Sequence, residues 1–137
     1  MKVVLDTNVL ISGIYWEGNE SIILKACKMQ NLTNYISPET LEEFKKVLFY
    51  NKFKLTPSEI ELAIETVLSF STVITPKIKL NVIKIDPVDN IFLECALASH
   101  ADCIISGDKH LLKLGSYKKI EIMKSKDFIK KYKNEIE

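Results

Sequence analysis

Four acidic residues occupy positions at which a folded chain could bring them together around a cation. Two of them follow short apolar runs: Asp6 comes directly after residues 3–5, and Asp108 comes after residues 103–105 and a Ser-Gly pair. Glu43 lies within an expected helix, and Asp89 ends an Asp-Pro-Val-Asp segment. The complete set is Asp6, Glu43, Asp89 and Asp108.

Carboxylates that converge repel one another and raise each other's pKa, and a divalent cation removes that cost. Ligation by oxygen alone favours Mg²⁺ or Mn²⁺ over Zn²⁺. We therefore expect one or two such ions. The chemistry they would support is phosphoryl transfer, in which the metal activates a water and stabilises charge on the attacking and leaving oxygens.

The acids that follow strands also have a structural interpretation. Asp is a preferred helix N-cap, so Asp6 and Asp108 could each cap the helix that follows. Thr7 or Asn8 could cap the first of these helices instead, which would leave Asp6 available.

The other acids have structural interpretations too. We assign Asp86 to an N-cap before Pro87, whereas Asp89 suits the third helical position and a metal site equally well. Glu43 could be a surface acid, but it lies nearest the stripe of Phe44 and Leu48 and shares a row with Val47.

The elements that must position these acids alternate along the chain. Strands are expected near residues 3–5, 35–36, 73–74, 82–85, 103–105 and 120–123. Helices are expected after residue 8, over 21–29, from Ser37-Pro38 to about 48, over 57–69, over 86–100 and 109–114, and from a Ser125 cap onward. This order predicts an α/β fold with a parallel sheet, in which ligands gather beyond the carboxyl ends of the strands.

Composition restricts the remaining classes. The chain has 137 residues, which suits one domain spanning residues 1–137. All 19 basic residues are lysine against 18 acids, so the net charge of +1 gives no general attraction to nucleic acid. No signal peptide or membrane span is indicated, and the three separated cysteines suit a reduced cytoplasmic location.

Several segments together resemble the PIN-domain family, and within it the toxin ribonucleases of toxin–antitoxin pairs. The matching segments are residues 4–10 (VLDTNVL), 37–44 (SPETLEEF), 86–90 (DPVDN) with the helix after it, and 101–109 (ADCIISGDK). They run in family order and cover nearly the whole chain.

The resemblance implies a three-layer α/β/α fold with a five-stranded parallel sheet of order 3-2-1-4-5. It implies metal binding and catalysis by Asp6, Glu43, Asp89 and Asp108, with Asn8 and Ser106 as supporting residues. It also implies metal-dependent endoribonuclease cleavage of single-stranded RNA, a homodimer and a cognate antitoxin protein.

One position departs from the family, because many relatives carry an acid where this chain has His110. Lys45, Lys46, Lys109 and Trp16 are candidates for RNA contact, and Lys52, Lys54 and Lys113 lie close to them in sequence. Solvated helix faces, or packing in the case of Trp16, would give the same pattern.

Two other functions fit parts of the pattern. A haloacid-dehalogenase-like phosphatase would form an acyl phosphate on Asp6, but Asn8 replaces the second aspartate that such enzymes use. A non-catalytic PIN-like adaptor for RNA or protein would not need all four acids.

Overall fold

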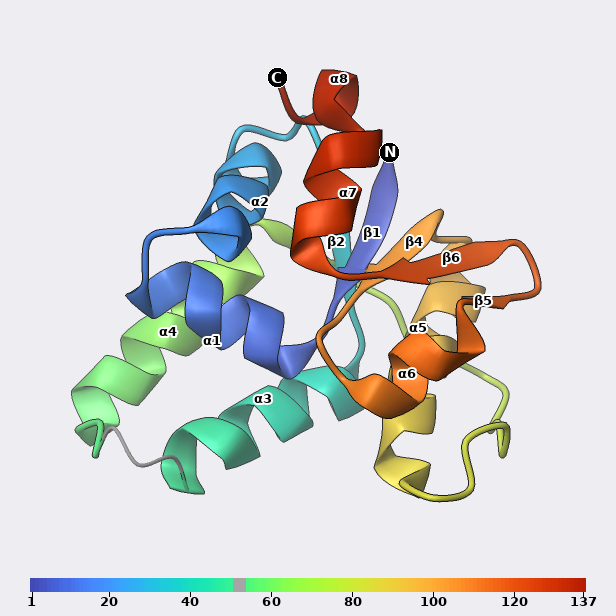
Figure 1. The fold of residues 1–137 in the computed structure, drawn as a ribbon. Coiled ribbons are helices and arrows are strands. Elements are labelled where there is room, and N and C mark those ends of the chain that lie inside the picture. Colours follow the sequence, from blue (N-terminus) through green and yellow to red (C-terminus); the bar gives the residue numbers. More distant parts are fainter. Residues whose placement is uncertain (51–53) are drawn as a thin grey trace.

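The central sheet is built from short apolar segments rich in β-branched residues. The computed structural model describes residues 1–50 and 54–137 and contains a six-stranded sheet of order β3-β2-β1-β4-β6-β5 (Figure 1). Its strands are β1 (Lys2–Leu5), β2 (Thr33–Ile36), β3 (Ser71–Val73), β4 (Cys103–Ile105), β5 (Ser116–Tyr117) and β6 (Ile120–Met123). All of them are parallel except β5, which pairs with β6 in the antiparallel direction.

The predicted α/β class is confirmed. The predicted order 3-2-1-4-5 is also confirmed for the parallel strands, among which β6 is the fifth along the chain. Two details differ. The two-residue edge strand β5 was not expected, and residues 82–85, predicted as extended, are irregular and belong to no strand.

Helices cover both faces of the sheet. They are α1 (Thr7–Tyr15), α2 (Asn19–Lys28), α3 (Pro38–Tyr50), α4 (Pro57–Ser69), α5 (Asn90–Ser99), α6 (Lys109–Leu114), α7 (Ser125–Lys131) and α8 (Lys133–Ile136). A 3₁₀ turn, Pro87–Asp89, precedes α5, so the expected 86–100 helix is divided. Ser125 was predicted to cap the last helical segment, but Lys124 occupies the N-cap and Ser125 is helical.

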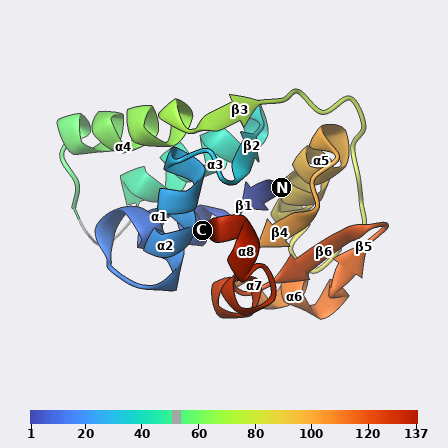
Figure 2. The ribbon, with the colours of Figure 1, turned by 90° about the horizontal axis from the view of Figure 1, so that it is seen from above.

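Alternation along the strands explains the two faces. Val3 and Leu5 belong to the core beneath α1, α2, α3, α4 and α7, whereas Val4 belongs to the core beneath α5 and α6. Strand β4 alternates in the same way, with Ile105 in the first core and Ile104 in the second. Figure 2 shows the resulting layers, with α1, α2 and α4 on one side of the strands and α5 on the other.

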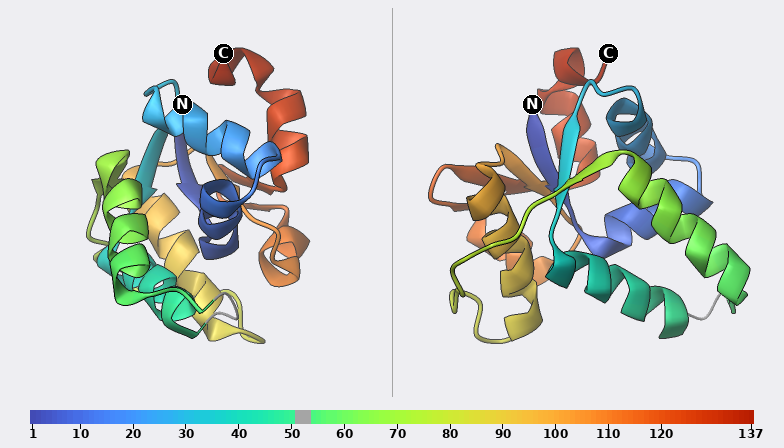
Figure 3. Two further views of the ribbon diagram at one scale, coloured as in Figure 1. Left: turned by 90° about the vertical axis from the view of Figure 1, so that its left-hand side faces the viewer. Right: turned by 180° about the vertical axis from the view of Figure 1, so that it is seen from behind.

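The parallel strands all end at the same edge. The chain leaves β1 and β2 there and turns directly into α1 and α3 (Figures 1 and 3). Strand β4 ends alongside β1, since the Asp6 amide donates to the Ile105 carbonyl at 3.0 Å. This edge therefore collects Asp6, the start of α3 and the 106–108 turn.

None of the helices that the structure describes is long and apolar enough to cross a membrane. The expectation that residues 1–137 form a single domain stays a prediction.

Candidate metal centre

The four predicted acids line one cavity of about 260 Å³ at the carboxyl edge of the sheet. They reach it from four separate segments: the end of β1, helix α3, the turn before α5 and the turn after β4. A further acid, Asp86, lines the same cavity. The four acids that the sequence analysis proposed as ligands therefore line one cavity together with Asp86. Of the four, Asp89 and Asp108 belong to the group whose oxygens lie within 4.8 Å of one another, and Asp6 and Glu43 line the cavity outside that group.

Asp6 is a helix cap and a cavity residue at once. Its Oδ1 accepts from the Thr7 amide at 2.7 Å, and its Oδ2 accepts from the Ser106 hydroxyl at 2.6 Å. The side chain is buried, with 5% exposed. Burial raises the pKa of this carboxyl, the two hydrogen bonds oppose the rise, and the charges of Asp108 and Glu43 add to it. The capping interpretation is thus correct without excluding a role in the site.

Ser106 links the first and last acids of the set. Its hydroxyl is fully buried, donates to Asp6 and accepts from the Asp108 amide at 2.9 Å. Asp108 in turn caps α6, because its Oδ1 accepts from the amides of His110 and Leu111 at 2.8 and 3.1 Å. Both acids are therefore held in fixed orientations by the backbone around them.

Asp89 has the most perturbed environment of the set. It is 7% exposed, and its Oδ2 meets no hydrogen-bond partner among the described residues. Burial, together with the charge of Asp108 and a hydrogen bond to it, raises the pKa of Asp89 to about 7, and the charges of Asp86 and Asp6 contribute further. A buried carboxylate oxygen without a partner is costly unless something supplies positive charge or a proton.

Asp86 occupies the N-cap position that the sequence analysis assigned to it, and it also lines the cavity, which was not expected. Its side chain forms no capping bond within the described chain, and its backbone carbonyl accepts from the Asp89 amide at 3.1 Å. Instead, one oxygen each of Asp86, Asp89 and Asp108 lie within 4.8 Å of one another. The signal was present in the spacing, because residues i and i+3 of a 3₁₀ turn lie above one another.

Asn90 positions this acidic turn, and the sequence analysis missed it. Its side-chain oxygen accepts from the amides of Val82 and Ile83, and its nitrogen donates to the carbonyls of Ile83 and Pro87. The side chain is 3% exposed. Glu94, one helical turn later, accepts from the Leu80 amide at 2.9 Å. These side-chain hydrogen bonds satisfy backbone groups of the irregular segment that a strand would have paired in a sheet.

Glu43 reaches the cavity from α3. It is half-buried beside Phe44, which is fully buried, and Val47 lines the same cavity as expected from the shared helical row. Thr7 also lines the cavity, and its buried hydroxyl has no hydrogen-bond partner among the described residues.

The remaining predicted residues are more scattered. Asn8 and Lys46 are exposed and line the cavity, whereas Lys45 is half-buried and lines a neighbouring hollow with Phe49 and Tyr50. Lys109 is exposed next to Asp108. Trp16 lies at the far end of α1, about 14 Å from its first turn at 1.5 Å per residue. Lys52 lies outside the described residues.

The donor set suits a hard divalent cation. The cavity offers carboxylate oxygens from several segments, and one of them is buried with no partner in the part of the chain that the structure describes. Such oxygens are the ligands that Mg²⁺ and Mn²⁺ prefer. The side chain of His110 is half-buried, and its contact with the site is through its amide on Asp108.

No curated protein matches the chain. The chain does match the PIN domain family over residues 2–110, and it belongs to that family. The resemblance to the PIN-domain family that the sequence analysis described is confirmed. PIN domains are generally nucleases that depend on divalent metal ions, and the acidic cluster of this chain agrees with that chemistry.

Proposed function

We propose that this protein is a metal-dependent endoribonuclease that hydrolyses phosphodiester bonds of single-stranded RNA. Asp6, Glu43, Asp89 and Asp108 would hold one or two Mg²⁺ or Mn²⁺ ions and form the catalytic centre. The observation that carries the proposal is that these acids line one cavity, where a buried oxygen of Asp89 has no hydrogen-bond partner among residues 1–50 and 54–137.

A bound divalent cation supplies positive charge that acidifies a water and stabilises the phosphodiester oxygens during hydrolysis. The protein's part is to hold the ligands rigid. Ser106 fixes Asp6 and the Asp108 backbone, while Asn90 fixes the turn that carries Asp86 and Asp89. We assign Asp86 as an additional ligand, since its carboxylate lies in the same acidic cluster.

Binding of a cation at this site is coupled to loss of a proton from Asp89. With its pKa near 7 and its hydrogen bond to Asp108, the metal-free site at neutral pH retains a proton for part of the time. Ligands bind cations in their deprotonated form, so binding releases that proton. Cation affinity should therefore rise from pH 6 to pH 8.

The test is cleavage of a single-stranded RNA with Mg²⁺, with Mn²⁺ and with a chelator. We expect cutting with either cation, and the Asp6→Asn variant should lose it. Asp127→Asn is the matched control, because Asp127 is an exposed acid on α7, away from the cavity. Full activity in chelator, or an Asp6→Asn variant as active as the control, would overturn the proposal.

The alternative of an aspartyl-phosphate enzyme has less support. Both oxygens of Asp6 already accept hydrogen bonds, and the side chain is 5% exposed, which suits a fixed ligand better than a nucleophile. A non-catalytic adaptor would bind no divalent ion at millimolar concentration. Titration of the purified protein with Mn²⁺ distinguishes it from the nuclease.

We further propose that the protein is a homodimeric toxin that a cognate antitoxin protein inhibits, a role typical of the family. The support is family membership. We expect a neighbouring gene that encodes a small DNA-binding protein. That protein should co-purify with this chain and block RNA cleavage. Growth unaffected by expression of the active nuclease would contradict the toxin role.

A further inference from the structure

A second polar cavity adjoins the acidic one. It has a volume of about 310 Å³ and shares the wall residue Asn8 with the acidic cavity. Ser106, which donates a hydrogen bond to Asp6 of the acidic cavity, also lines the second one. Its outer wall is the start of α7, where Lys124 and Lys126 are exposed and line the cavity. The two cavities therefore lie side by side, with Asn8 in the wall of each.

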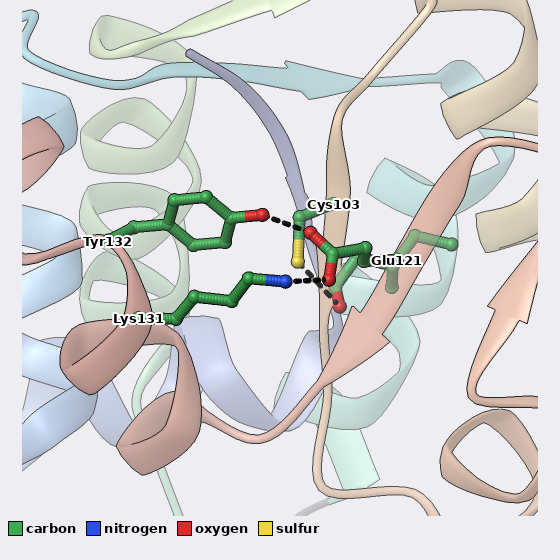
Figure 4. A network of polar contacts seen from close by, with 5 residues as sticks. Cys103, Glu121, Lys131 and Tyr132 are labelled. Atoms are coloured by element: carbon green, nitrogen blue, oxygen red, sulfur yellow. Dashed lines mark hydrogen bonds and ion pairs between the residues drawn. The ribbon is translucent and has the colours of Figure 1, made fainter.

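The position of the two lysines is fixed by the anchoring of α7. Phe128 is fully buried in the core, so the helix cannot slide along the sheet. At its far end, Lys131 and Tyr132 both contact the carboxylate of Glu121 on β6: the ammonium forms an ion pair and the phenol donates a hydrogen bond (Figure 4). Lys124 and Lys126 are thus presented by a helix that is held at both its middle and its end.

The two cavities differ in charge. The acidic cavity collects carboxylates and calls for cations, while the second combines two ammonium groups with neutral donors and acceptors from Asn8, Ser12 and Asn19. Glu20 is an acidic member of the second lining. Ammonium groups bind phosphate oxygens, and amide and hydroxyl groups suit the 2′-hydroxyl and base edges of RNA.

We propose that this second cavity is an RNA subsite that binds the phosphodiester adjacent to the one being cut, with Lys124 and Lys126 as its phosphate contacts. The inference rests on the proposed nuclease function, whose substrate it would orient across the acidic cavity. Neither lysine belongs to the residues that the PIN domain match covers, which end at 110.

The test compares two double variants that remove equal charge. Lys124→Gln/Lys126→Gln removes the proposed contacts, whereas Lys130→Gln/Lys133→Gln removes exposed lysines of the same C-terminal segment that do not line the cavity. Both change the net charge by the same amount, so a general effect of charge cancels. The probe is a labelled uridine oligonucleotide of about 10 nucleotides, and binding is measured in chelator as a function of salt.

Each phosphate contact to a single strand contributes about 0.7 to the slope of log affinity against log salt, so loss of two contacts lowers the slope by about 1.4. At 0.1 M salt this corresponds to about 25-fold weaker binding for Lys124→Gln/Lys126→Gln. The control pair should stay within about twofold, because exposed charges outside the path are screened. Equal loss in both variants would overturn the proposal.

A second arm separates this inference from the nuclease proposal. With Mn²⁺, the cavity variant should show a raised KM for RNA cleavage and a kcat close to that of the wild type, because its acids are intact. A lowered kcat with unchanged KM would contradict a substrate-binding role. If the wild type cuts no RNA at all, the nuclease proposal fails, while the comparison of binding slopes still decides the subsite.

Discussion

Replacing Asp89 with asparagine should stabilise the metal-free protein while abolishing its response to metal. The carboxylate is 7% exposed, lies beside other acids and has an oxygen without a partner among the described residues. An asparagine amide is neutral and donates hydrogen bonds, so it can reproduce the bond that a protonated Asp89 makes to Asp108. The substitution therefore removes repulsion and retains the shape.

The size of the effect follows from the pKa. The folded-state pKa of Asp89 is about 7, whereas an unfolded chain has a value of about 3.9. Because the folded value is the higher one, the stability linked to this proton is complete below about pH 3.9 and is lost as the pH rises to 7. Three pKa units correspond to about 4 kcal/mol, which water at the cavity mouth reduces to about 2 kcal/mol.

Thermal unfolding in chelator measures this directly. At pH 8, Asp89→Asn should melt about 6 °C above the wild type, and at pH 4 the difference should nearly vanish. Added Mn²⁺ at about 100 times its Kd should stabilise the wild type by about 2.7 kcal/mol and the variant far less. Asp127→Asn should behave as the wild type throughout. A variant that is less stable than the wild type at both pH values, or that gains equally from Mn²⁺, would refute the reasoning.

Three further predictions concern the surroundings of the site. Gly13→Ala should lower the free energy of unfolding by about 1–3 kcal/mol in thermal melts, because the added Cβ would lie 2.7 Å from Leu24 Cδ1 and 2.9 Å from the Glu20 carbonyl oxygen. The control Gly107→Ala should be tolerated, because its Cβ meets no described atom within 4 Å. Asn90→Ala should weaken Mn²⁺ binding about tenfold in calorimetry although no ligand is removed, and the exposed control Asn81→Ala should leave it unchanged. Burial raises the pKa of each of the three cysteines to about 12, so alkylation at pH 8 should be about 10³-fold slower in the native protein than in denaturant; rapid native labelling would contradict the packing.

The positions of the acids could be predicted because they depend on local patterns. Asp6 and Asp108 each follow a buried strand, and parallel strands end at a common edge. Glu43 could be placed from the helical row that it shares with Val47. Both inferences use only the spacing of apolar residues along strands and helices, which can be seen in the sequence itself.

The misassigned features depend on long-range contacts. Residues 82–85 have the apolar, β-branched character of a strand, but the buried Asn90 side chain forms hydrogen bonds with backbone groups of that segment. There a tertiary contact outweighed the local preference. Asp86 has the sequence context of a helix cap, and its spacing from Asp89 is local, whereas only the folded chain brings Asp108 to the pair.

The bond between Ser106 and Asp6 joins positions 100 residues apart. A growing chain on the ribosome therefore exposes its early acids throughout synthesis, long before the serine that orients the first of them has been made. If the proposed hydrolysis needs the assembled centre, nascent chains that have not reached residue 106 would leave the RNA around them intact. The proposed activity would then arise only after the segment that contains Ser106 and Asp108 has been synthesised.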